Sequence, residues 1–150
     1  MATKSGAASN AGLATQPSLT LKRRLQARPE KVYAAWTDPE KIALWFGPPG
    51  SKVVESKFET RAGGAFMIFC VGATGEEFYV SGTVKEAVAD RRLVYTWAWR
   101  GTPDRVSLVT TEFKPDGDGT LMTLTHEQFF DEAVRDRHNQ GWEFVLDNLA

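Results

Sequence analysis

The chain has 150 residues, of which 42% are hydrophobic and 25% charged, and its formal net charge is −1. This size and composition indicate one globular domain with a substantial core, and the near-neutral charge argues against nucleic-acid binding. No apolar run approaches the roughly 18 residues that a membrane span needs, and the single cysteine cannot form an internal disulfide. We therefore expect a soluble, cytoplasmic protein.

The N-terminal residues 1–17 are small and polar and have no hydrophobic periodicity. Such a stretch has too little apolar surface to build a core, so we predict a disordered arm. It lacks the apolar central region of a secretory signal, which argues against export. Residues 18–150 contain no repeat and no internal linker, and they are predicted to form a single domain.

The first part of this domain is predicted as one strand followed by two short helices. Residues 18–25 alternate between apolar and polar side chains, as a strand with one exposed face does. Pro29 suits the first turn of a helix. Residues 38–40 (DPE) combine a cap, a proline at the first helical position and an acid in the first turn. Glycine and proline at residues 47–50 end the second helix.

The middle of the chain is predicted as a run of strands separated by short turns. Because short turns join neighbouring antiparallel strands, these segments should form one meander. The fourth strand of the chain contains Gly82, where we expect a bend or bulge. The predicted strands after the two helices are residues 52–60, 65–71, 78–88, 93–100, 106–114 and 121–129.

The last segment, residues 131–150, has the spacing of an amphipathic helix. A run of strands and one long helix favour an α+β fold in which a curved antiparallel sheet of about seven strands grips the helix. Gly141 removes a side chain where the sheet or a ligand comes close. The predicted apolar stripe comprises Val134, His138, Gly141, Trp142, Val145 and Leu149.

Side-chain alternation within the strands predicts which residues face the helix. Glu86 falls on an inward face, where an unpaired carboxylate is costly, so we expect it at the rim. The predicted concave face comprises Phe66, Ile68, Cys70, Tyr95, Trp97, Trp99, Met122, Leu124 and His126, and the helices add Trp36, Trp45 and Trp142.

These inward side chains fit either a solid core or a cavity. Apolar walls with a few polar tips are the usual composition of a small-molecule site. An inward histidine is more often a hydrogen-bonded core residue than a catalyst, and both interpretations of His126 stay open. On the cavity interpretation, the candidate ligand contacts are Trp36, Trp45, Phe66, Ile68, Tyr95, Trp97, His126 and Trp142.

Motifs for metal, phosphate or hydrolase chemistry are missing from the sequence. Two histidines and one cysteine cannot form a typical zinc site without carboxylates. There is no glycine-rich phosphate loop and no Gly-x-Ser-x-Gly elbow. We therefore expect no metal, no cofactor and no defined set of catalytic residues.

Several short blocks resemble a known family. Residues 32–40 (VYAAWTDPE) and 44–48 (LWFGP) are similar to the opening of the Aha-like family, and Phe46 stands where many relatives carry a second tryptophan. These relatives are homologues of the C-terminal domain of the heat-shock protein 90 ATPase activator, in the START-like (SRPBCC, Bet v-type) superfamily. Later blocks that also resemble the family are Gly63-Gly64, Gly82, residues 92–97, residues 123–127 and Gly141-Trp142.

The resemblance covers about residues 18–150 and implies a helix-grip fold with a hydrophobic cavity between the sheet and the C-terminal helix. It favours a non-enzymatic binding protein for a small hydrophobic or aromatic ligand. One alternative is an enzyme similar to a polyketide cyclase, dehydratase or hydrolase, using His126 or Tyr95. Another is a module that interacts with a chaperone, which is less expected from one domain. A homodimer also stays open.

Overall fold

The computed structural model describes residues 16–149. Most of the predicted arm, residues 1–17, lies outside the described residues and stays a prediction. Pro17 is described, and its carbonyl oxygen accepts a hydrogen bond from the backbone N–H of Phe129 at 3.2 Å. Between residues 16 and 149 no helix is long and apolar enough to cross a membrane.

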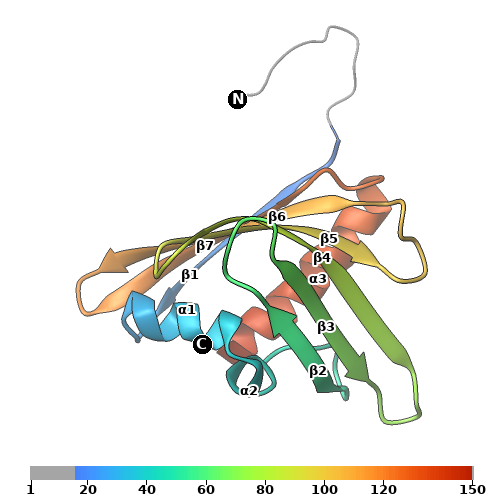
Figure 1. Cartoon of the computed structure of the whole chain (residues 1–150), viewed down its shortest axis with the longest axis horizontal. Helices are drawn as coiled ribbons and strands as arrows, with labels where there is room; N and C mark the ends of the chain where they lie inside the picture. The colour runs from blue at the N-terminus through green and yellow to red at the C-terminus, as the bar shows by residue number, and fades with distance from the viewer. Residues whose placement is uncertain (1–15, 150) are drawn as a thin grey trace, which may run out of the picture.

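Seven antiparallel strands form one curved sheet, in the chain order expected from the sequence (Figure 1). The order across the sheet is β1-β7-β6-β5-β4-β3-β2, so the first and last strands are neighbours and β2 forms the other edge. The strands are β1 (Leu19–Leu25), β2 (Lys52–Phe58), β3 (Ala65–Val71), β4 (Glu77–Val88), β5 (Arg92–Trp99), β6 (Ser107–Asp116) and β7 (Gly119–Glu127).

Two short helices, α1 (Pro29–Thr37) and α2 (Pro39–Ile42), connect β1 to the opposite edge of the sheet. Asp38 separates them and caps α2, because its side chain accepts a hydrogen bond from the backbone N–H of Glu40 at 2.9 Å. The indole N–H of Trp45 donates to the carbonyl oxygen of Ala35 at 3.0 Å. This bond fixes the loop after α2 against α1.

The C-terminal helix α3 (Glu132–Leu149) runs along one face of the curved sheet (Figure 1). It is continuous through Gly141, as the sequence predicts, and its buried residues are Trp142, Val145 and Leu146. Asp131 caps its first turn, since the carboxylate accepts a hydrogen bond from the backbone N–H of Val134 at 2.9 Å. The α+β helix-grip fold is confirmed.

The predicted inward faces of β3, β5 and β7 are also confirmed. Residues at alternate positions are buried, while their neighbours on the same strands are less covered. Trp99, at the end of β5, is only half-buried. The fully buried members of the predicted concave face are Phe66, Ile68, Cys70, Tyr95, Trp97, Met122, Leu124 and His126.

The irregularity in β4 lies farther along the strand than Gly82. The register with β5 shifts between Val84 and Glu86, so a bulge turns Glu86 outward. Glu86 is exposed, as expected for the rim, and forms an ion pair with Arg92 at 3.2 Å. Gly82 serves a different purpose, because a Cβ there would lie 1.9 Å from the carbonyl oxygen of Thr96. The glycine therefore allows β4 and β5 to approach closely.

Candidate functional site

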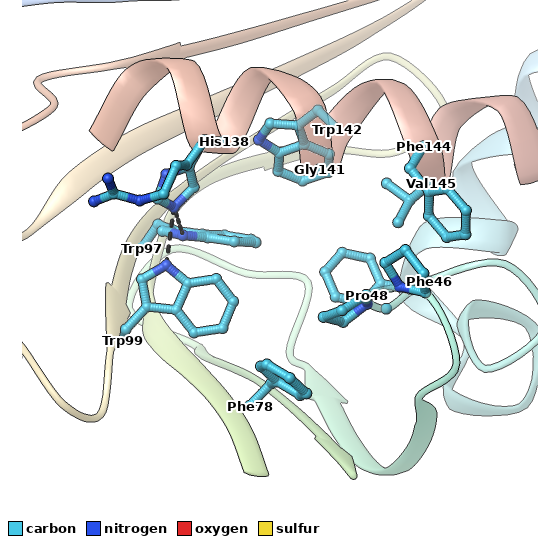
Figure 2. A pocket seen from close by; sticks show the side chains of 13 residues that line it. Phe46, Pro48, Phe78, Trp97, Trp99, His138, Gly141, Trp142, Phe144 and Val145 are labelled. Atoms are coloured by element: carbon cyan, nitrogen blue, oxygen red, sulfur yellow. Dashed lines mark hydrogen bonds between the residues drawn. The ribbon is translucent and has the colours of Figure 1, made fainter. Parts of the chain in front are cut away.

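A cavity of about 430 Å³ lies between α3, the end of β5 and the loop after α2 (Figure 2). It opens to solvent, since Gly141 and Phe144 on its wall are exposed. The surrounding side chains are mostly aromatic or aliphatic. The cavity is lined by Phe46, Gly47, Pro48, Pro49, Phe78, Trp97, Trp99, Arg137, His138, Gly141, Trp142, Phe144 and Val145.

The loop after α2 forms one wall of the cavity. Phe46 packs edge-on against Trp97 and Trp142, with ring centroids 6.4 Å and 6.1 Å away. Gly47 turns the chain behind it with a φ of +121°, which favours glycine, and a Cβ there would lie 2.7 Å from the hydroxyl oxygen of Ser51. The tight turn holds Phe46 against the end of the sheet.

Gly141 forms the opposite wall, on α3. A Cβ at Gly141 would meet nothing within 4 Å, so the missing side chain leaves open space over the helix. Trp142 is next in the chain and is 3% exposed, so it shows only part of its ring to the cavity. Figure 2 shows these two residues on α3 facing the labelled side chains of β4, β5 and the loop after α2.

His138 connects α3 to β5 at the edge of the cavity. Its Nε2 accepts hydrogen bonds from the indole N–H of Trp99 at 2.8 Å and of Trp97 at 3.3 Å (Figure 2). An indole nitrogen only donates, so Nε2 carries no proton. The proton of the neutral ring is therefore on Nδ1, which donates to the carbonyl oxygen of Val134 at 2.8 Å.

His126 lies deeper and is held in the opposite tautomer. The indole N–H of Trp142 donates to its Nδ1 at 3.0 Å, so the proton of the neutral ring is on Nε2. That N–H donates to the hydroxyl oxygen of Ser107 at 2.7 Å, and Ser107 in turn donates to the carbonyl oxygen of Trp97 at 3.2 Å. In this arrangement His126 cannot accept a proton from Ser107, as activation of a serine nucleophile would require.

The sequence matches the family described as "Activator of Hsp90 ATPase homolog 1-like protein" over residues 26–150. The chain belongs to this family. The blocks on which the resemblance rests contribute to the cavity, since Phe46, Trp97, Gly141 and Trp142 all line it.

Solved structures of similar proteins have the AHSA1-like fold. Protein CV1439 of Chromobacterium violaceum is 30% identical with a TM-score of 0.77, and the alignment covers 89% of this chain and 94% of that one. For the AHSA1 protein of Silicibacter pomeroyi the identity is 27%, the TM-score 0.80 and the coverage 89% and 95%. CalU16 of Micromonospora echinospora is 32% identical, with a TM-score of 0.68 and coverage of 88% and 73%. The curated proteins include no match to this chain.

Two of the eight predicted contact residues, Trp97 and Trp142, line the cavity of this AHSA1-like chain. The others face inward as expected but pack in the core around it. Alternation in the sequence predicts that a side chain lies on the concave face of the sheet, but it does not show whether that side chain packs in the core or lines a cavity. The six in the core, each at most 5% exposed, are Trp36, Trp45, Phe66, Ile68, Tyr95 and His126.

Several lining residues were absent from the predicted set. His138, Gly141 and Val145 belong to the predicted helical stripe, and Trp99 belongs to the predicted concave face. The sequence therefore indicated that these four residues face the interior, although they were not among the predicted ligand contacts. Arg137 lies beside the predicted stripe. Phe46, Pro48, Pro49, Phe78 and Phe144 come from a loop, from β4 and from the edge of the α3 stripe, and periodicity alone gave no reason to bring them together.

The surroundings of both imidazoles favour the neutral form. Burial lowers the pKa of His126 well below its ordinary value, and the nearby His138 lowers it further. Burial also lowers the pKa of His138; the hydrogen bond to Val134 opposes this effect and the charge of Arg137 adds to it. Burial raises the pKa of Tyr95, so its phenol is uncharged. The described part of the chain has no group of three or more metal-ligating side chains.

Proposed function

We propose that this protein is a non-enzymatic binding protein for a small hydrophobic or aromatic ligand, held between the sheet and α3. The observation that carries the proposal is the aromatic-walled cavity of about 430 Å³. Its size and mainly apolar lining are those of small-molecule sites, whose few polar groups orient the ligand. Residues Trp97, Trp99 and Trp142 supply large flat surfaces, which suit a ring system.

Hydrogen bonding supports binding over catalysis by His126 or Tyr95. Both nitrogens of His126 are engaged within the protein, and its side chain is fully buried. Tyr95 is 1% exposed and does not line the cavity. A general base or acid must reach the atom whose proton it transfers, and neither side chain reaches the cavity. No observation favours the chaperone alternative, and the cytoplasmic location stays a prediction.

Probe binding tests the proposal. N-phenyl-1-naphthylamine, a neutral apolar dye, should bind the wild-type protein and quench its tryptophan emission, since several tryptophans line the cavity. The Gly141→Leu variant should lose this binding, because the new side chain enters open space in the cavity. Its folding should be preserved, since leucine favours a helix more than glycine does. Native mass spectrometry of the purified protein adds a search for a co-purified ligand.

Gly101→Leu is the matched control. Gly101 also has open space around its Cβ position, but it does not line the cavity. This variant should bind the dye as the wild-type protein does. Absence of dye binding by the wild type, or equal binding by Gly141→Leu and the wild type, would show that the cavity is not the binding site.

A further inference from the structure

Arg137 is the charged side chain in the cavity lining. It forms no ion pair with any residue between 16 and 149, whereas Arg135, two positions earlier, pairs with Asp136 at 2.9 Å. The residues one helical turn away on either side, 133–134 and 140–141, include no acid. Within residues 16–149, the guanidinium that α3 contributes to the cavity lining is therefore not paired with a carboxylate.

Arg137 lies close to the part of the cavity that Gly141 leaves open. It lies one helical turn before Gly141, which places the two Cα atoms about 6 Å apart along the helix axis. Because Gly141 has no side chain, a ligand can lie directly on α3 at this point. A molecule in that position lies against the aromatic walls, and Arg137 is the charged residue among those that line the cavity.

The polar groups of the tryptophan and histidine side chains in the lining already form hydrogen bonds within the protein. The indole N–H groups of Trp97 and Trp99 donate to His138, and that of Trp142 donates to His126. The two nitrogens of His138 are both engaged, one as acceptor and one as donor. The guanidinium is thus the side-chain group left for a polar part of the ligand. It only donates hydrogen bonds, so its partner must be an acceptor.

We propose that the ligand is an amphipathic organic anion with an aromatic body, whose acidic group pairs with Arg137 while its rings occupy the cavity. The guanidinium fork matches the two oxygens of a carboxylate or sulfonate, and Arg137 is exposed, so the acidic group can pair with it at the solvent side of the cavity. This inference rests on the proposed function and specifies the class of ligand that the same cavity takes.

Two dyes that differ by one sulfonate test the inference. N-phenyl-1-naphthylamine is neutral, and 1-anilinonaphthalene-8-sulfonate adds the anionic group. In Arg137→Gln, the dissociation constant of the anionic dye should rise about three- to tenfold, the range of an exposed charge pair that also makes hydrogen bonds. The dissociation constant of the neutral dye should change by less than about twofold in the same variant, because the contacts of this dye with the cavity are apolar. In the wild type, added salt should weaken only the anionic dye.

Arg135→Gln is the control for charge, since it removes one positive charge from the same helix away from the cavity lining. It should leave both dissociation constants unchanged, and Arg137→Lys should retain part of the preference for the anion. If Arg137→Gln weakens both dyes equally, or neither, the anion site is overturned while cavity binding stands. If the wild type binds neither dye, the proposed function fails as well.

Discussion

The interior of the curved sheet is filled at one end and hollow at the other, although aromatic rings line both. We call the filled end the Trp36 cluster, which consists of the rings of Trp36, Trp45, Phe113 and Trp142. There the centroid of Trp36 lies 4.8 Å from Trp45, 6.4 Å from Phe113 and 5.9 Å from Trp142. The hollow end is the cavity beside Trp99 and Gly141. Trp142 belongs to both and separates them.

The difference lies in what covers each end. Helix α1 packs on β6 and β7, and Trp36 on that helix is 1% exposed. At the cavity, the cover is a loop on one side and a helix without a side chain at Gly141 on the other. Tryptophan side chains therefore lie on the concave side of the sheet at both ends. Whether the space next to them is filled depends on the helix or loop that covers each end.

The largest expected effect compares one tryptophan from each end. Trp36→Ala should lower the free energy of unfolding by about 3–5 kcal/mol, the usual cost of removing a large ring from a close-packed core. Trp99→Ala should cost less, about 1–2 kcal/mol, because this half-buried ring already borders empty space. Urea denaturation of both variants measures the two changes.

Trp36→Phe is the control for the ring's volume. The indole N–H of Trp36 is buried and has no hydrogen-bond partner among residues 16–149, so its loss removes an unpaired donor. Trp36→Phe should therefore lower the free energy of unfolding by less than Trp36→Ala does. Equal costs for the alanine variants at Trp36 and Trp99 would show that the two ends are packed alike.

The pH dependence of stability gives an intermediate effect. The folded-state pKa values of His126 and His138 lie below their ordinary values, so the unfolded chain binds more protons as the pH falls below about 6.5. The stability from neutral histidines is complete above that pH and declines below it, by at most about 1.4 kcal/mol per pH unit for each ring. Urea denaturation between pH 7 and pH 5.5 follows the decline.

The variant His138→Gln separates the contributions of His138, at the edge of the cavity, and His126, in the core, to the pH dependence of stability. A glutamine keeps an acceptor for the indole of Trp99 but does not titrate in this range. The slope of stability against pH should decrease and a remaining slope should come from His126. If the slope of the variant equals that of the wild type, protonation of His138 does not oppose folding, and the cavity edge is more open to water than its hydrogen bonds indicate.

The smallest expected effect concerns Gly141. The Gly141→Ala variant should raise the free energy of unfolding by about 0.5–1 kcal/mol, because alanine favours the helix and its Cβ meets nothing within 4 Å. Thermal denaturation should show a slightly higher midpoint. A lower midpoint would mean that another group occupies this space in solution, and the hollow end would then be partly filled.

The sequence by itself determined the elements and the direction of most side chains. Alternation in β3, β5 and β7 identified the inward faces, and the spacing of residues 131–150 identified α3, including its passage through Gly141. These patterns are local, because a strand repeats every two residues and a helix every 3.6. The family was likewise predictable from short blocks and is confirmed over residues 26–150.

Only the tertiary structure decided which inward residues border open space. Phe46, Phe78 and Trp99 belong to three separate segments, and their contact with one cavity depends on how the loop after α2, β4 and β5 are packed with α3. The bulge after Val84, which turns Glu86 outward, likewise depends on pairing with β5. The tautomers of the two histidines are set by indoles from distant positions in the chain. Contacts of this kind join residues far apart in sequence, so no local period in the sequence encodes them.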